Sequence, residues 1–399
     1  MNILKAVQAY LPFREMGGPV VKVQALASTL TRHGHRVSVV TADLGLASRR
    51  DTRLSVERCS WGWRAECDAV EIIYLPTLAH YRALTLNPSV IEFAKSALRK
   101  FDLVHFYGLY DLLGPAISFY CRRYGIPYVI EPMGMNRPIE RSIRLKQLWH
   151  RSIGDAFLQN AEKIIATSEL EQQELIEDNY SPEKVVMRHN GVALVSTKAG
   201  FARGVFRMKH GISMDEPLLL FLSRLIPRKG ADVLIQAFSK ACPGSGHLVI
   251  AGPEGEAGYR AFLERCAFDS GIAERVIFVG PLYDEEKIAA LIDSDIFVLP
   301  SRYENFANVV AEAIAYDIPV IISPFCGIRS LVQGRVGFVV LPNVNELASA
   351  IRRLLQDKPL YAQLKAGCKA VAAELSWENL TRQMEASYGE ILASNNGDH

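Results

Sequence analysis

Two glutamates, Glu304 and Glu312, stand where carboxylates could bind a ligand. Glu304 follows an apolar segment, residues 296–300, that is typical of a buried strand, and Glu312 lies about one turn inside the helix expected next. Asn308 can cap or begin this helix, which leaves amide N–H groups of its first turn unpaired. Because such a helix end attracts anions, the segment predicts a site in which phosphates lie between one carboxylate near a sugar and another near a ribose.

A second charged loop follows the apolar segment at residues 217–223 and reads Arg224-Leu-Ile-Pro-Arg-Lys-Gly230. Arg224 and Lys229 are five residues apart at the expected carboxyl end of a strand. The guanidinium can bind two oxygens of a diphosphate, and the ammonium can add a point charge. Ligands of open parallel sheets bind beyond the carboxyl ends of the strands, so we expect this loop and the Glu304 turn to line one cleft.

A glycine pair, Gly17 and Gly18, lies between the first apolar segment and the first expected helix. A turn without side chains lets backbone amides approach a phosphate or a sugar closely. A tight turn with no ligand is the alternative. The spacing is not the Gly-x-Gly-x-x-Gly of dinucleotide enzymes, which disfavours a nicotinamide oxidoreductase.

The segment at residues 300–312, with its two glutamates, resembles the signature of glycosyltransferase family 4, and the loop at residues 224–230 strengthens the resemblance. This family implies an α/β fold of the kind called GT-B, in which two facing Rossmann-like domains with parallel sheets enclose an interdomain cleft. It also implies transfer of a sugar from a nucleotide-sugar with retention of anomeric configuration, without a metal and without a further cofactor.

The resemblance implies which residues bind the donor. Glu304 would hold the sugar hydroxyls, Glu312 would accept from the ribose diol, and Arg224 and Lys229 would stabilise the departing diphosphate. Glu304, Arg224 and Lys229 are therefore the expected catalytic residues. The expected donor-binding set is Gly17, Gly18, Arg224, Lys229, Leu282, Glu304, Asn305, Phe306, Ala307, Asn308 and Glu312. Asn305 and Ala307 stand where the family often has glycine, so we expect an adjusted pocket.

The acceptor side departs further from the family. His105 begins a pattern that commonly reads His-x-His-Gly, but Tyr107 stands in place of the second His, so His105 is either a loop ligand or a buried strand residue. Met133 occupies a slot where the resemblance predicts His or Arg near the donor sugar. Glu131 and the Gly134 amide are the remaining polar candidates there. His105, Tyr107, Glu131, Met133 and Gly134 form the expected acceptor-binding set.

The family resemblance favours a UDP-sugar, with UDP-glucose ahead of GDP-mannose, and a saccharide or lipid-linked saccharide acceptor in polysaccharide or glycolipid synthesis. Two alternatives stay open: a nucleotide-sugar epimerase, or a protein of the same fold that binds a nucleotide-sugar without catalysis. An epimerase would convert the sugar with no acceptor present, whereas a transferase would wait for one.

Apolar segments alternate with amphipathic ones along the chain, a pattern typical of parallel sheets covered by helices. We expect an acceptor-binding domain at residues 1–195 and a nucleotide-sugar-binding domain at residues 196–376, with a last helix at 377–394 returning to the first domain. Residues 44–68 are polar and are expected to form a long surface excursion.

The chain has 399 residues, and 49% hydrophobic content is enough for two buried cores. Its net charge of +2 argues against a nucleic-acid-binding surface. Seven cysteines with no Cys-x-x-Cys pair indicate a reducing compartment, the cytoplasm. His33 and His35 have no third ligand near in sequence, so no metal site is expected. The uncharged run at 318–328 is far shorter than the roughly 20 residues of a membrane span.

A helix expected at residues 138–159 carries two kinds of side chain. Its apolar side should pack on the sheet, and its basic side should face solvent. This predicts peripheral contact with anionic lipid at the inner face of the membrane, with a solvated charged face as the alternative. The apolar side is Ile139, Ile143, Leu145, Trp149, Ile153 and Phe157, and the basic side is Arg137, Arg141, Arg144 and Arg151.

Overall fold

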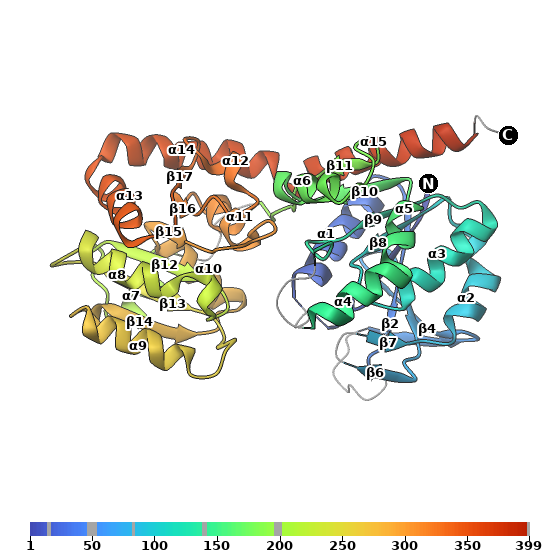
Figure 1. Ribbon diagram of the computed structural model, residues 1–399, viewed down its shortest axis with the longest axis horizontal. Helices are drawn as coiled ribbons and strands as arrows, with labels where there is room; N and C mark the ends of the chain where they lie inside the picture. Colours follow the sequence, from blue (N-terminus) through green and yellow to red (C-terminus); the bar gives the residue numbers. More distant parts are fainter. Residues whose placement is uncertain (14–16, 46–53, 82–83, 138–141, 195–201, 397–399) are drawn as a thin grey trace. The chain divides into compact units, whose positions relative to one another are not determined.

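The computed structural model describes residues 1–399 except 14–16, 46–53, 82–83, 138–141, 195–201 and 397–399. The chain divides into two α/β units (Figure 1). Unit 1 comprises Met1–Asn190 and Trp377–His399, and unit 2 comprises Gly191–Ser376. Two Rossmann-like units with parallel sheets were predicted, and this prediction is confirmed.

Unit 1 is built on a nine-stranded sheet in the order β11-β10-β9-β8-β1-β2-β5-β4-β3. The strands from β11 to β5 are parallel, and β4 and β3 extend the sheet in antiparallel fashion. Strands buried on both faces read as nearly continuous apolar runs. These strands are β1 Asn2–Val7, β2 Arg36–Ala42, β3 Val56–Cys59, β4 Gly62–Cys67, β5 Val70–Leu75, β8 Leu103–Tyr107, β9 Tyr128–Glu131, β10 Lys163–Ala166 and β11 Val185–Met187, with a separate hairpin of β6 Ala79–Tyr81 and β7 Leu84–Leu86.

Helices cover both faces of this sheet. Alternate residues of β1 point to opposite faces, so Leu4 and Ala6 join the core beneath α2 and α3, whereas Ile3 and Val7 join the core beneath α1 and α15. The helices of unit 1 are α1 Gly18–Arg32, α2 Val90–Ala97, η3 Leu98–Lys100, α3 Leu113–Tyr124, α4 Ile143–Trp149, the π-helix η4 His150–Gly154, α5 Asp155–Gln159, α6 Glu169–Glu177 and α15 Trp377–Asn396.

The prediction that residues 44–68 form only a surface excursion is wrong for its second part. Strands β3 and β4 form a hairpin that lengthens the sheet at its β5 edge. Short strands with charged residues near the edge of a sheet do not show the apolar pattern of a buried strand. Gly62 has φ 153°, and a Cβ there would lie 2.2 Å from the Tyr74 carbonyl oxygen, so glycine lets β4 approach β5.

The helix expected at 138–159 is interrupted by the π-helical turn η4, and its first four residues lie outside the described residues. Ile143 and Leu145 were expected to pack on the sheet, but 44% and 54% of their surfaces are exposed, so that expectation is wrong. The π-turn contains an extra residue, which rotates Ile143 away from the face of Phe157, the residue that does pack in the core. This rotation does not explain the exposure of Leu145.

The expected basic side changes as well. Arg137 is partly exposed but pairs with Glu177 and Asp178, at 2.9 and 3.0 Å, so its charge is already partnered within the protein. Arg144 and Arg151 are exposed, and Arg141 lies outside the described residues.

Unit 2 contains a six-stranded parallel sheet in the order β14-β13-β12-β15-β16-β17 around one core. Its strands are β12 Leu218–Leu222, β13 His247–Ala251, β14 Val276–Gly280, β15 Ile296–Leu299, β16 Val320–Ile322 and β17 Gly337–Val339. Its helices are α7 Val205–Lys209, η5 Pro227–Lys229, α8 Ala231–Ala241, α9 Tyr259–Asp269, η6 Ala273–Arg275, α10 Asp284–Asp293, α11 Asn308–Ala315, α12 Arg329–Val332, α13 Val344–Gln356 and α14 Lys358–Glu374.

The last helix, α15, is fixed to unit 1 by a cluster of histidines and carboxylates. His33 Nδ1 lies 2.9 Å from Glu385 Oε1, and His33 Nε2 lies 2.9 Å from Glu378 Oε1. Both ring nitrogens must donate to satisfy these contacts, so the ring is an imidazolium. Desolvation opposes the charge, but the hydrogen bonds to Glu385 and Glu378 outweigh it and raise the pKa of His33.

We expect the attachment of α15 to weaken as the pH rises. Because the pKa of His33 is raised by folding, its stabilising contribution is complete below the ordinary histidine pKa of about 6.5 and is lost as the pH rises through the raised value. Hydrogen exchange of α15 amides, corrected for intrinsic rates, should therefore increase on the alkaline side of that range. In His33→Gln this additional increase in exchange at alkaline pH should disappear. An unchanged pH dependence in this variant would contradict the role of His33 in holding α15.

Candidate functional site

The loops beyond the carboxyl edge of the unit 2 sheet are joined by main-chain hydrogen bonds. Leu225 N donates to Pro253 O at 2.9 Å, and Gly252 N donates to Gly280 O at 2.8 Å. A Cβ at Gly252, where φ is 144°, would lie 1.8 Å from the Ser223 carbonyl oxygen. Only glycine permits this approach, and it holds the loop that contains Arg224 against its neighbour.

Glu304 is fixed through its main chain and paired through its side chain. Its N–H donates to Phe325 O at 2.9 Å, and its carbonyl accepts from Gly327 N at 3.0 Å. Its carboxylate forms an ion pair with Lys229, whose side chain is 7% exposed. The fold therefore brings together a carboxylate and a cation that are 75 positions apart in sequence.

The helix α11 begins next to this pair. Ala307 has φ 75°, a left-handed conformation that costs a non-glycine residue about 1–2 kcal/mol, which explains why glycine suits this position. Phe306 and Ala307 are buried, and Asn308 is exposed as the first helical residue. Asn305, which precedes them, is half-buried.

Glu312, inside α11, forms an ion pair with Lys287 of α10. Both side chains are partly exposed, at 32% and 27%. Lys287 is missing from the expected site, because nothing in the pattern around residue 287 distinguishes it from a solvated lysine. Its signal is the three-dimensional contact with Glu312.

The other expected donor residues divide between the units. Arg224 is exposed directly after β12, and Leu282 is buried in the turn that follows β14. Gly17 and Gly18 belong to unit 1, where they are exposed at the start of α1. Gly17 has φ 92°, so the turn requires a left-handed residue even though a Cβ would meet nothing within 4 Å.

The expected acceptor residues differ from the expected donor residues in burial, because most of them lie in the interior of unit 1. His105 is a fully buried strand residue, which decides between the two alternatives for it. Its Nδ1 lies 2.6 Å from Tyr388 Oη of α15 and 3.1 Å from Tyr107 Oη, and the Tyr107 hydroxyl accepts from Lys5 Nζ at 2.7 Å. Burial and the nearby cations Lys5 and Arg188 lower the pKa of His105.

Glu131 is also fully buried. It forms ion pairs with Arg188, at 2.5 Å, and with Lys22 of α1. Its carboxylate is thus part of an internal charge cluster, and the expectation that His105, Tyr107 and Glu131 contact an acceptor directly is not supported by their placement. Sequence reasoning missed Lys22 and Arg188, because each looks like a solvated charge on its own segment.

Met133 and Gly134 lie in a half-buried loop after β9, with φ 56° and 75°. The Gly134 N–H donates to Glu171 Oε1 at 2.5 Å, so this amide is already used within the protein. Glu171 also accepts from the Thr167 main chain and hydroxyl, at 2.8 and 2.7 Å. The loop is therefore held by α6.

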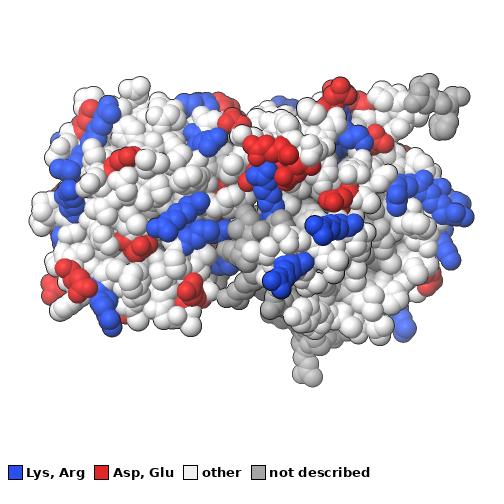
Figure 2. Space-filling model, viewed as in Figure 1, with Lys and Arg blue, Asp and Glu red and all other residues white. Residues whose placement is uncertain are grey.

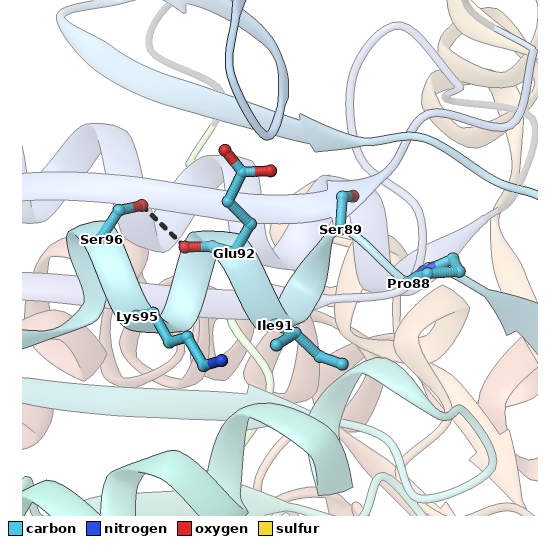
Figure 3. Close-up of a pocket in the computed structure, with 6 residues that line it drawn as sticks. All are labelled: Pro88, Ser89, Ile91, Glu92, Lys95 and Ser96. Atoms are coloured by element: carbon cyan, nitrogen blue, oxygen red, sulfur yellow. Dashed lines mark hydrogen bonds between the residues drawn. The ribbon is translucent and has the colours of Figure 1, made fainter.

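One further cavity, on unit 1, has no chemistry of its own. A cavity of about 620 Å³ lies against α2 (Figure 3), but Glu92 and Lys95 point away from each other and no polar groups converge. Within the described ranges, no group of three histidines, cysteines or carboxylates could hold a metal ion. In the same residues, every helix is too short or too polar to cross a bilayer.

Comparisons with known proteins agree with this architecture. The family model "Glycosyl transferase 4-like domain" matches residues 17–191, and the model "Glycosyl transferases group 1" matches residues 202–370. An uncharacterized glycosyltransferase of Methanocaldococcus jannaschii is 25% identical over 398 residues, 96% of each chain. D-inositol 3-phosphate glycosyltransferase of Mycolicibacterium smegmatis is 28% identical over 62% of this chain and 58% of its own.

Solved structures show the same fold at lower identity. Sucrose-phosphate synthase from Thermosynechococcus elongatus has a TM-score of 0.74 and 21% identity, over 98% of this chain and 99% of its own. Anabaena HepE in complex with UDP and glucose has a TM-score of 0.72 and 19% identity, over 98% and 100%. With glycosyltransferase models matching both units and relatives of the same kind along its length, the chain belongs to glycosyltransferase family 4 and has the GT-B fold.

Proposed function

We propose that this glycosyltransferase moves a sugar from a UDP-sugar, with UDP-glucose favoured, to a saccharide or lipid-linked saccharide acceptor, with retention and without a metal. The observation that carries the proposal is the convergence of Lys229 and Glu304 at the carboxyl edge of the unit 2 sheet. The complex of Anabaena HepE with UDP and glucose supports the choice of donor by analogy of fold.

The chemistry follows from charge. In a retaining transfer the sugar–phosphate bond loosens first, so positive charge grows on the sugar and negative charge on the diphosphate. Lys229, Arg224 and the amides that open α11 supply positive potential to the diphosphate, and Glu304 holds sugar hydroxyls. The donor would replace the contact of Lys229 with Glu304, and its ribose diol would replace that of Lys287 with Glu312. The leaving phosphate would take the acceptor's proton.

Donor binding and metal independence are tested together. In a thermal-shift titration with nucleoside diphosphates, UDP should raise the melting temperature more than GDP or ADP. Sugar transfer should persist in excess EDTA, because fixed cations replace a metal in this site. Strict dependence on Mg²⁺ or Mn²⁺ would contradict the metal-free mechanism. Conversion of the sugar without any acceptor would indicate an epimerase.

The roles of Glu304 and Arg224 can be separated in one crossed experiment. Glu304→Gln should abolish transfer but retain UDP binding, because the carboxylate contacts the sugar. Arg224→Ala should weaken UDP binding by about 2 kcal/mol, the low end for a charge-assisted contact, because this side chain is exposed without ligand. Arg265→Ala, an exposed arginine on α9, is the matched control. Equal loss of UDP binding in the Glu304 and Arg224 variants would refute the division of roles.

We also propose that the enzyme works in the cytoplasm, in peripheral contact with anionic membrane through α4. All seven cysteines are free, which suits a reducing compartment. Large apolar side chains are exposed on α4 at Ile143, Leu145 and Leu148, beside Arg144 and Arg151. Figure 2 shows basic and acidic groups interspersed on the viewed face. The attraction to the membrane would therefore come from the exposed apolar residues, and each basic residue near the membrane surface would add about 1 kcal/mol.

Sedimentation with vesicles of anionic lipid tests this contact. The protein should sediment with them at low salt, and Leu145→Ser/Leu148→Ser should release it to the supernatant. Ile176→Ser, which changes an exposed apolar residue on α6, should not. If both variants sediment like the unchanged protein, α4 is not the contact.

A further inference from the structure

A polar cavity of about 300 Å³ opens on unit 1 between the π-turn η4 and the end of α6. Asn136 and Tyr180 line it from the loop after β9 and from the residues after α6, and His150, Arg151 and Asp155 line it from η4 and α5. Its size is at the lower end of ligand pockets, which span about 300–1,000 Å³. None of these residues belongs to the expected donor or acceptor set.

Hydrogen bonding fixes the tautomer of His150. The Tyr110 hydroxyl donates its one proton to Met135 O at 2.8 Å, so the Nε2–H of His150 must donate to the Tyr110 oxygen, 2.9 Å away. Nδ1 is then an acceptor in the neutral ring. The nearest carboxylate oxygen, Asp155 Oδ1, lies 3.8 Å from Nδ1, beyond hydrogen-bond distance. Burial supports this state, since it lowers the pKa of His150.

Glycine at position 154 leaves space beside Nδ1. Gly154 ends the π-turn, and a Cβ at this position would lie 3.1 Å from His150 Nδ1 and 3.5 Å from Trp149 Cδ1. A single π-turn inside an α-helix is rare and is frequently found at functional sites. The turn and the glycine together place an unpaired acceptor beside the cavity.

Charge excludes two classes of ligand. An anion would meet the Asp155 and Asp178 carboxylates. A cation would find the charge of Asp178 already paired with Arg137, and Asp178 also accepts from Asn136 at 2.6 Å; Asp155 accepts from Tyr180 at 3.2 Å and keeps lone pairs for a further donor. Arg151 adds a positive charge to the lining. A neutral ligand with several hydroxyl groups fits instead, since each hydroxyl both donates and accepts.

We propose that this cavity binds one sugar ring of a neutral saccharide, with a sugar hydroxyl donating to His150 Nδ1 and others meeting Asp155, Arg151 and the amide of Gln147. That the saccharide is part of the acceptor or product rests on the proposed function. The binding of a sugar here does not, and it is measured separately from the binding of UDP.

Saturation-transfer NMR with the methyl glycosides of glucose, galactose and mannose tests the site. At least one should receive saturation from the unchanged protein and from Asp215→Asn, a control at an exposed aspartate of unit 2. Gly154→Ala should lower the affinity for that glycoside at least about tenfold, equivalent to about 1.4 kcal/mol, and should weaken its signal accordingly. This change suits a helical backbone and should not unfold the protein. Asp155→Asn should weaken binding in the same direction.

Three results would overturn the proposal: no saturation of any glycoside at high millimolar concentration, equal saturation in the Gly154 and Asp215 variants, or binding of ethylammonium or inorganic phosphate in place of the glycosides. Thermal shifts with UDP in the same samples report on the donor site alone. If the protein binds UDP but no glycoside at this cavity, the proposed function stands and this inference is wrong. If it binds a glycoside here but no UDP, this inference stands and the proposed function is wrong.

Discussion

The ion pair between Lys229 and Glu304 is the contact on which the proposed donor site depends. A lysine with 7% of its side chain exposed needs a counter-charge, because a buried ammonium without one is costly. Glu304 supplies that charge and is itself held by main-chain bonds to Phe325 and Gly327. Each group is thus held in position by the other before a ligand arrives. Under the proposed mechanism the donor would take the place of this contact, so both groups already lie beside the position where electrostatic stabilisation of a transition state requires them.

Unit 1 uses buried charge in a different way. Lys22 and Arg188 converge on Glu131, and Lys5 reaches the same region through Tyr107. Removal of the carboxylate alone would leave uncompensated cations in the interior, which is far more destabilising than replacing the whole cluster by apolar residues. Tyr388 of α15 joins this cluster through its hydrogen bond to His105. The position of the last helix on the sheet is therefore fixed by a directional polar contact, which an apolar core would not provide.

Sequence reasoning succeeded where local pattern determines structure. The apolar runs at β5 and β12 and the loops after β12 and β15 could be recognised because strand burial and turn chemistry act over a few residues. The edge hairpin β3–β4 was missed, since edge strands carry polar residues on a solvated side. The partners Lys287, Lys22 and Arg188 were missed for another reason: Arg188 and Glu131 are 57 positions apart, and no local pattern encodes such a pairing.

One backbone irregularity accounts for two features that a regular helix would not give. A π-turn adds one residue to the turn, which offsets the helical segments on either side by about 100°. With no offset, Ile143 and Phe157 would share a face, and both would be buried. With it, Phe157 remains in the core while Ile143 turns outward. The same turn widens the helix at His150, and glycine at 154 leaves the space beside Nδ1 free of a Cβ. The exposure of Ile143 and the polar cavity beside α4 therefore arise together, and a regular α-helix through residues 150–154 would remove both.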